Sequence, residues 1–297
     1  MIDQKLYSVL KVHETGNFTK AASELSLTQP AVSQHILSLE KELGVKIFER
    51  HAGSISTTRE GELVVQYAKR MMALYANLKN ELSSETRHVT SLTVGVTHTA
   101  ESNQITAALA KYASINSLSI KIQTSTINNL YDMLSNYELD FAIMEGAPAD
   151  NRWQYLPLDT DSLVLAVSPS HRLAKKDLIR ISDVKKEKMI LRLPNSNTRN
   201  LFVSSLEAKN MSINEFNVIL EIDNIATIKD LIRHDYGVSV LAKSVCLDEI
   251  RKKKIVCLPI EGFSMVREIN VVCEKDFRYP DILQGVINEY LETRRKY

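Results

Sequence analysis

Two helix stops within the first 44 residues limit the fold of this chain more strongly than any other feature of its sequence. Apolar residues recur at helical spacing over residues 3–15, and Gly16 follows where a helix commonly ends. A second such glycine, Gly44, comes after another periodic stretch that begins near Gln29. Only a short helix and a tight turn fit between Gly16 and Gln29. The sequence therefore predicts three short helices packed closely together.

The segment between the two stops has the signals of a helix-turn-helix. Thr19 is expected to cap a second helix over residues 20–25. The paired alanines at 21–22 let another helix approach closely, as two crossing helices require. Residues 26–28 form the predicted turn.

The predicted third helix has an apolar face and a short polar face. Thr28 is expected to cap it, and Pro30 suits its first turn, where a backbone N–H has no helical partner. The expected buried stripe consists of Val32, Ile36, Leu39 and Leu43. The other face carries short or amide side chains that fit a major groove, where Gln pairs with adenine and Ala or Pro contacts a thymine methyl. These residues are Gln29, Pro30, Ala31, Ser33 and Gln34.

A β-hairpin is predicted after the third helix. Residues 45–49 are expected to form one strand, residues 50–54 a turn that contains Gly53, and residues 55–57 the returning strand. Such a wing lies along DNA phosphates, and Arg50 is its main charge.

The stretch GNFTKAASELSLTQPAVSQHILSLEKELGVKIFERHAGSISTTREG closely resembles the signature of the LysR family, in a match that covers residues 1 to about 62. The resemblance implies a winged helix-turn-helix in which Gln29, Pro30, Ser33 and Gln34 face bases. It also implies that Thr28, His35, Lys46 and Arg50 position the duplex. A helical domain that binds no DNA is the alternative.

The charge of this region is low for a DNA-binding module. Residues 1–58 hold six basic and six acidic residues, and residues 51–54 lack the further Arg or Lys usual in LysR wings. Phosphate contacts supply much of DNA affinity. We therefore expect modest affinity for each module and reliance on dimerisation.

A long helix is predicted to connect this module to the rest of the chain, over residues 59–88. Thr57 and Glu60 have the spacing of a capping box, and residues 83–90 are polar like a hinge. Apolar residues in the helix follow a heptad pattern, which favours packing against a second copy of the same helix. They are Val64, Tyr67, Met71, Leu74 and Leu78.

Beyond residue 90, short strands alternate with helices, which predicts an α/β fold with mostly parallel sheets. This half is similar to the LysR effector domain at four landmarks: VGVT at 94–97, YELDFAIMEG at 137–146, AVSPSHRLAKK at 166–176 and DLIRHDYGVSVLAKS at 230–244. The resemblance implies two Rossmann-like lobes, as in periplasmic binding proteins.

The expected domains follow from these patterns and the resemblance. They are a winged helix-turn-helix at 1–58, a linker and dimerisation helix at 59–88, and an effector-binding domain at 89–297. Lobe one is expected at about 91–161 and 266–297, and lobe two at about 162–265.

Ligands of α/β sheets bind beyond the carboxyl ends of strands, near helix N-termini that favour anions. The resemblance therefore places a small-molecule effector, of anionic or carboxylate character, between the lobes. The expected contacts are Thr97, His98, Thr99, Glu145, Asn195, Ser196, Thr198 and Asn224. Helix capping is the alternative role for Thr99, Ser196 and Thr198.

Two further observations bear on the effector. The segment 97–99 is similar to the cysteine-biosynthesis branch of the family, whose effectors are sulfate-like molecules or acetylated serine. Glu101 and Glu145 near the expected cleft count against a bare anion.

Other function classes lack their signals. The widely spaced Cys246, Cys257 and Cys273 indicate reduced thiols, neither a metal site nor a disulfide framework, and no cofactor is expected. Hydrolase, nucleotide-binding and metalloprotease motifs are missing from the sequence, so we expect no catalytic residues. A solute-binding protein would need a signal peptide, and neither that nor an apolar run of about 18 residues occurs.

The sequence thus predicts a cytoplasmic LysR-type regulator of transcription. Its expected partners are double-stranded promoter DNA, a small-molecule effector and further copies of itself, as a homodimer or homotetramer. RNA polymerase would join them if the protein activates transcription, and no membrane is expected.

Overall fold

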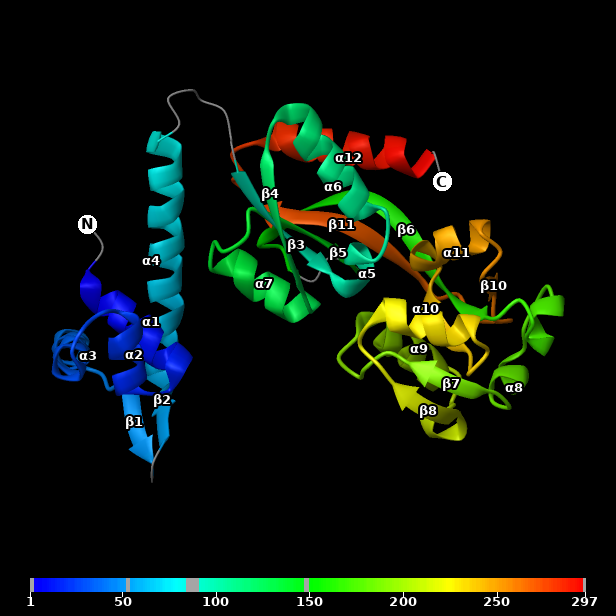
Figure 1. Cartoon of the computed structure of the whole chain (residues 1–297), viewed down its shortest axis with the longest axis horizontal. Coiled ribbons are helices and arrows are strands. Elements are labelled where there is room, and N and C mark those ends of the chain that lie inside the picture. Colours follow the sequence, from blue (N-terminus) through cyan, green and yellow to red (C-terminus); the bar gives the residue numbers. More distant parts are fainter. Residues whose placement is uncertain (1–2, 52–53, 84–90, 147–149, 296–297) are drawn as a thin grey trace. The chain divides into compact units, whose positions relative to one another are not determined.

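The computed structural model describes residues 3–51, 54–83, 91–146 and 150–295, which form two compact units. The N-terminal unit ends with a long helix, and the C-terminal unit begins with the strand after it (Figure 1). The elements of the N-terminal unit are α1 (Gln4–Thr15), α2 (Phe18–Glu24), α3 (Gln29–Leu43), β1 (Phe48–His51), β2 (Ser54–Thr57) and α4 (Arg59–Ser83).

The first three helices begin and end largely where the sequence predicts. Gly16 closes α1 with φ 62°, and Gly44 closes α3 with φ 69°, a left-handed conformation that glycine adopts without strain. The Thr28 side chain accepts a hydrogen bond from the backbone N–H of Ala31, at 3.3 Å, and so caps α3. The predicted cap of α2 is wrong, because the Asn17 side chain accepts from the N–H groups of Thr19 and Lys20.

The paired alanines are buried where the helices of the N-terminal unit meet. Ala21 and Ala22 pack with Val12 and Val32, which confirms that small side chains allow this close approach. A neighbouring cluster joins the helices to the wing and to α4. Its buried members are Val9, Ile36, Leu39, Ile47 and Val65.

Leu43 is 48% exposed, so its place in the predicted buried stripe is wrong. The chain after Gly44 folds back over Glu40 instead. The Glu40 carboxylate accepts a hydrogen bond from the N–H of Ile47 at 2.8 Å and pairs with the ammonium of Lys46 at 2.7 Å. The last turn of α3 therefore keeps its outer side uncovered.

The wing pairs antiparallel, with the register Phe48↔Thr57 to His51↔Ser54. Its first strand starts three residues later than predicted, and the turn expected around Gly53 lies outside the described residues. The predicted capping box of α4 is also wrong. Thr58, one residue after the predicted cap, accepts from the N–H of Gly61 at 2.8 Å.

Gly61 lets α4 approach the wing closely. A Cβ at this position would lie 2.1 Å from the carbonyl oxygen of Ile47, which is too close for any side chain. The same carbonyl accepts from the N–H of Thr58 at 3.0 Å. The start of α4 is thus fixed against the segment that enters the wing.

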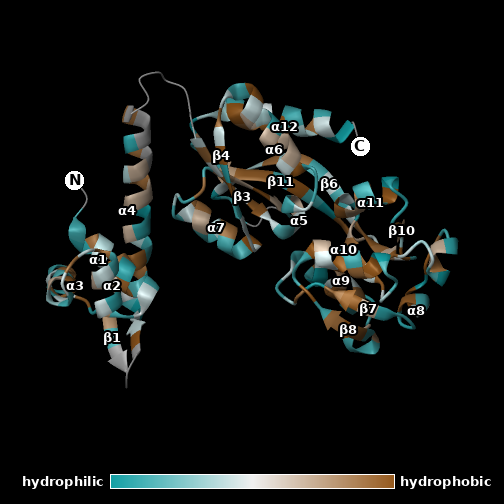
Figure 2. Cartoon of the chain, in the orientation of Figure 1, coloured by the Kyte–Doolittle hydropathy of each residue, from teal (hydrophilic) through white to brown (hydrophobic). Residues whose placement is uncertain are grey.

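The C-terminal unit is α/β, as predicted, and Figure 2 shows apolar strands beneath helices with one apolar face. Its strands are β3 (Ser91–Thr97), β4 (Ser119–Ser125), β5 (Phe141–Glu145), β6 (Trp153–Val167), β7 (Lys188–Leu191), β8 (Asn217–Glu221), β9 (Ser239–Ala242), β10 (Val256–Leu258) and β11 (Val266–Glu274). Its α-helices are α5 (His98–Glu101), α6 (Ile105–Asn116), α7 (Ile127–Ser135), α8 (Ile181–Val184), α9 (Asn197–Glu207), α10 (Ile225–Arg233), α11 (Leu247–Arg251) and α12 (Pro280–Arg295).

The expectation of mostly parallel sheets is wrong. The strand order is β10-β6-β11-β5-β3-β4, with β9 also on β6. The pairs β3–β4, β3–β5 and β7–β8 are parallel, whereas every pairing of β6 or β11 is antiparallel. The alternation of strands and helices does not specify the direction of pairing, and β6 is 15 residues long rather than short.

Two separate cores lie along these strands. One core is built from buried residues between positions 163 and 265. The other contains Leu130, Leu134, Ala142 and Trp153. In Figure 1, β6 and β11 run side by side from one lobe into the other. The lobes are therefore joined by two neighbouring strands.

The alternation of strands and helices beyond residue 90 also predicts a helix over about residues 102–114. It corresponds to α6, which begins at Ile105, and the Asn103 side chain accepts from the N–H of Ile105 at 2.8 Å before its first turn. Cys246 and Cys273 are buried, Cys257 is partly buried, and all are free thiols. Among the helices described, none is long and apolar enough to cross a bilayer.

Candidate DNA-binding surface and effector cavity

The N-terminus of α3 presents a polar surface to solvent. Thr28, Pro30 and Gln34 are exposed, and Gln29, Ala31 and Ser33 are half-buried. Gln29 donates a hydrogen bond from Nε2 to Ser33 Oγ at 2.8 Å, one turn further along. This bond orients the amide, yet Oε1 and the second Nε2 hydrogen stay available for a bidentate contact with adenine.

The residues expected to position the duplex have different surroundings. His35 is half-buried, and its Nδ1 is hydrogen-bonded to Ser8 Oγ at 2.8 Å, so α1 orients the ring. Lys46 is exposed but pairs with Glu40. Arg50 lies in β1, where its backbone pairs with Ile55, and its side chain is outside the described residues.

The Glu40–Lys46 pair has an electrostatic consequence. Burial alone would raise the pKa of the Glu40 carboxyl. The Lys46 ammonium and the N–H groups of Ile47 and Phe48 nevertheless hold that pKa below its ordinary value. The carboxylate therefore stays ionised and neutralises part of the charge that Lys46 offers to phosphates.

A cavity of about 210 Å³ opens between the two lobes of the C-terminal unit. This is many times the space of about 10–15 Å³ that a single water needs. Its lobe-one wall comes from the ends of β3, β4 and β5, and its lobe-two wall from the segments that follow β7 and β8. The lining residues are Thr97, His98, Thr99, Ser125, Thr126, Ile127, Asn128, Glu145, Arg192, Asn195, Ser196, Asn197, Asn200 and Asp223.

Six of the predicted effector contacts line this cavity and two do not. The six are Thr97, His98, Thr99, Glu145, Asn195 and Ser196. Asn224 instead caps α10, since its side chain accepts from the N–H of Thr227 at 2.9 Å. Thr198 is buried in the first turn of α9, where its hydroxyl accepts a 3.4 Å hydrogen bond from Arg267.

Sequence reasoning missed several lining residues. The rule that ligands sit beyond strand ends applies to β4 as well, and it would have indicated Ser125, Thr126 and Asn128. Arg192 also lines the cavity, because β7 ends at Leu191 and Arg192 is the first residue beyond that strand end. Asn197, Asn200 and Asp223 also line the wall.

Two hydroxyl groups at helix starts have different tasks. The Thr97 hydroxyl accepts from the N–H of Ala100 at 3.1 Å and caps α5. Ser196 occupies the N-cap position of α9, but its side chain makes no capping bond. The Ser196 hydroxyl and the first N–H groups of α9 are therefore available to a ligand.

Contacts across the cavity join the lobes. Asn197 donates from Nδ2 to the backbone carbonyl of Glu145 at 3.2 Å. His98 Nε2 lies 3.9 Å from a carboxylate oxygen of Asp223. The cavity thus has groups from both lobes within reach of one small molecule.

Comparison with known proteins agrees with both halves of the chain. Residues 4–62 match the family described as "Bacterial regulatory helix-turn-helix protein, lysR family", and residues 86–294 match "LysR substrate binding domain". The chain belongs to the LysR family. It is a LysR-type DNA-binding transcription regulator with an effector-binding domain, and members of this family are regulators and not enzymes.

One similar LysR-type relative is the "HTH-type transcriptional regulator CysL" of Bacillus subtilis (strain 168), which is 28% identical over 90% of each chain. Among solved structures, full-length CbnR in complex with its target DNA is 18% identical, with a TM-score of 0.71, and the match covers 99% of this chain and 100% of that one. The effector-binding domain of QuiR in complex with shikimate is 19% identical, with a TM-score of 0.56, and the match covers 71% of this chain and 99% of that one.

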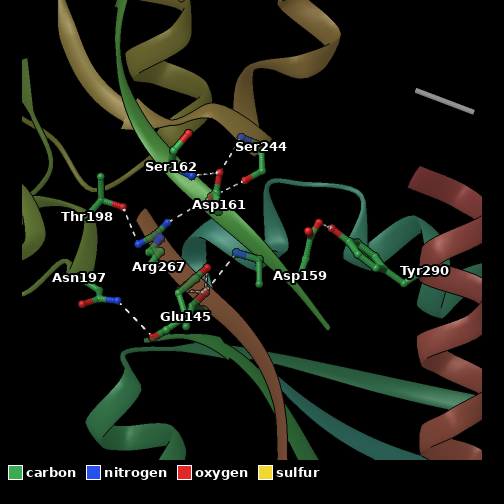
Figure 3. A network of polar contacts seen from close by, with 11 residues as sticks. Glu145, Asp159, Asp161, Ser162, Asn197, Thr198, Ser244, Arg267 and Tyr290 are labelled. Carbon is green, nitrogen blue, oxygen red and sulfur yellow. Dashed lines mark hydrogen bonds and ion pairs between the residues drawn. The ribbon is translucent and has the colours of Figure 1, made fainter. Parts of the chain in front are cut away.

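In this LysR-type regulator, a polar network lies where β6 and β11 cross between the lobes (Figure 3). Asp161 and Arg267 are paired positions of the two strands, and Arg267 Nη2 lies 3.6 Å from Asp161 Oδ2. Asp161 also accepts from the hydroxyl of Ser244 at 2.8 Å. Because Arg267 also reaches Thr198, the first turn of α9 contacts both the cavity and the crossing strands.

Helix α4 carries the predicted heptad residues on its surface. Four of them are each about half exposed: Tyr67, Met71, Leu74 and Leu78. Leu63 and Leu82, on the same helix, are more exposed than these. Val64 differs, since it is half-buried and packs against the core of the N-terminal unit.

Proposed function

We propose that this LysR-type regulator binds double-stranded promoter DNA as a homodimer or homotetramer, and that a small effector in the cavity between the lobes controls it. The effector is polar and carries a negative charge. The observation that carries this proposal is the cavity itself, which is lined almost entirely by hydroxyl, amide and charged side chains of both lobes.

The negative charge is supported by the start of α9. N–H groups at a helix N-terminus have no helical partner, and the helix dipole favours an anion there. The Ser196 hydroxyl, which makes no capping bond, adds a donor. A ligand bound here touches both lobes and so changes the free-energy difference between their open and closed arrangements.

Base readout is assigned to the solvent-facing start of α3, with Gln29, Pro30, Ala31, Ser33 and Gln34 toward base edges. Thr28, His35, Lys46 and Arg50 are assigned to the phosphates. The exposure of this face and the Gln29–Ser33 bond support the assignment.

Dimerisation is assigned to α4. A row of half-exposed apolar side chains on one helix is unusual on a free surface, and a second α4 would bury it. We expect Tyr67, Met71, Leu74 and Leu78 to form the seam, with Val64 at its edge. Tetramers would add contacts between effector domains.

The remaining assignments follow from this role. We propose the domain limits 1–58, 59–88 and 89–297, and a place in the cytoplasm, where the chromosome of a prokaryote lies. RNA polymerase becomes a partner if the regulator activates transcription.

The proposal is tested with the full-length protein and the intergenic DNA upstream of its own gene. A gel shift should show binding that exceeds binding to random duplex of equal length. A metabolite panel should then contain compounds that raise the melting temperature, because a ligand that binds only the folded state stabilises it. Equal binding to both duplexes would contradict the regulator's expected specificity, and stabilisers that never alter operator binding would contradict control by the cavity.

A further inference from the structure

The cavity holds a buried carboxylate that has no cationic partner among the described residues. Glu145, at the end of β5, lines the cavity and is 2% exposed. Its carboxylate oxygens both lie 2.8 Å from the hydroxyl of Thr97. A hydroxyl has only one hydrogen to donate, so a full negative charge is left with a single donor.

The facing lobe holds a cation whose donors are incompletely used. Arg192, directly after β7, lines the same cavity and is 3% exposed. Its Nη2 pairs with Asp223 at 2.8 Å, while Nε and Nη1 have no hydrogen-bond partner in the part of the chain that the structure describes. Buried donors are satisfied in the great majority of cases, so two unpaired ones indicate a missing acceptor.

Glu145 and Arg192 do not neutralise each other. Glu145 and Arg192 stand on different lobes, and no ion pair joins Glu145 to any residue that the structure describes. Burying an ionised group without a partner is costly. The pattern is therefore a negative group on one wall and an under-used positive group on the other.

We propose that the effector is a zwitterion of the α-amino acid class. Its ammonium group faces Glu145, and its carboxylate faces Arg192 and the start of α9. This inference rests on the proposed function, because it assigns a chemical class to the ligand of that same cavity.

Other classes fit less well. A bare anion would meet Glu145 without compensation, and Asp223 stands beside Arg192 on the opposite wall. A simple cation would leave the donors of Arg192 and the N-terminus of α9 unused. A neutral molecule would leave the charge of Glu145 unpaired. A zwitterion satisfies both walls at once and joins the two lobes by ionic contacts.

The first test measures the melting temperature of the full-length protein with each of the twenty standard L-α-amino acids. Each is compared with its N-acetyl form, which lacks the ammonium charge, and with its carboxamide, which lacks the carboxylate. Sulfate and four-carbon and five-carbon dicarboxylates serve as anions without an ammonium group. We expect at least one amino acid to stabilise the protein and to bind at least tenfold more tightly than both of its derivatives.

The second test uses variants with the amino acid found in this way. Glu145→Gln should weaken binding of this amino acid at least tenfold, or about 1.4 kcal/mol. It should also reduce the ratio between the affinities for the amino acid and for its N-acetyl form. Arg192→Gln should reduce the ratio between the affinities for the amino acid and for its carboxamide. Glu101→Gln is the matched control, because this exposed carboxylate on α5 does not line the cavity. Glu145→Asp keeps the charge if the glutamine variant fails to fold, and should retain the preference for the ammonium form.

Several outcomes overturn the assignment. They are stabilisation by dicarboxylates or sulfate as strong as by any amino acid, no stabilisation by any amino acid, and unchanged affinity in Glu145→Gln. Operator binding is measured in parallel. If a non-zwitterionic compound stabilises the protein and alters operator binding, the chemical class is wrong while the proposed function stands.

Discussion

At the scale of single residues, Glu40 shows how an acidic side chain supports a DNA-binding module. It connects the end of α3 to the entry of the wing through the Ile47 N–H and the Lys46 ammonium. The residues that face bases depend on this frame, because α3 must enter the groove at a fixed angle relative to the wing.

Glu40 should make the stability of the module depend on pH. Its pKa is held below the ordinary value of 4.5, so its contribution is present above pH 4.5 and is lost as the pH falls through the lower, folded-state pKa. Glu40→Gln should lower the stability of α3 by about 1 kcal/mol at pH 7 and remove this acid dependence. Hydrogen exchange of the α3 amides measures both effects. The exposed Glu42 serves as control through Glu42→Gln, and an equal effect there would refute the role of Glu40.

Base readout belongs to the same scale. Gln29→Ala should weaken operator binding by about 1–3 kcal/mol and leave random duplex almost unaffected, because a lost base contact removes specific affinity only. Ser33→Ala should give a smaller loss of the same kind, since Ser33 holds the Gln29 amide. Binding to both duplexes is measured at one salt concentration. Equal loss on both would remove Gln29 from base readout.

Single residues also mark the limit of what the sequence can predict. Capping at Thr28 and closure at Gly16 and Gly44 depend on neighbours in the chain, and these predictions are confirmed. Leu43 and Arg192 depend on where distant segments fold back, which local periodicity does not contain. Six of eight predicted effector contacts line the cavity because strand ends are recognisable, whereas Asn224 turns into its own helix cap.

At the scale of elements, α4 is the helix whose surface is unexplained within one chain. Its residues Tyr67, Met71, Leu74 and Leu78 follow a heptad pattern and are each about half exposed. The strands β6 and β11 present the opposite situation. Their hydrophobic pattern predicted ordinary strands, yet their length lets them belong to both lobes, and only the fold shows this.

The α4 seam predicts a selective loss. Met71→Glu would place a charge without a partner inside the seam of a dimer, which is costly. DNA binding should fail while the effector domain keeps its melting temperature. A gel shift measures DNA binding, thermal denaturation measures the melting temperature, and sedimentation shows whether the dimer is lost. Ala76→Glu, which is exposed but off the seam, should behave like the wild type. A Met71→Glu protein that still bound its operator as a dimer would contradict the seam.

At the scale of the whole molecule, each DNA-binding module is expected to have modest affinity, so two or more modules must act together under the control of the effector domain. The first 58 residues have balanced charge, so one module gains little from phosphates, and pairing of modules is expected to supply affinity. The effector domain can act on this arrangement only through a difference in ligand affinity between its states.

Arg50 should dominate the nonspecific part of that affinity. Arg50→Ala should weaken binding to operator and random duplex alike and reduce the slope of log affinity against log salt by about one per module. Titrations at several salt concentrations measure the slope. A loss confined to the operator would instead assign Arg50 to base readout.

A ligand in the cavity between the lobes is expected to control the regulator. The most direct test of this control compares the wild type with the double variant Thr99→Val, Ser196→Ala over a metabolite panel, by melting temperature and operator gel shift. We predict that the variant folds and binds its operator normally but is no longer stabilised by, or responsive to, any compound that acts on the wild type. A double variant that kept both responses would show that the ligand binds elsewhere.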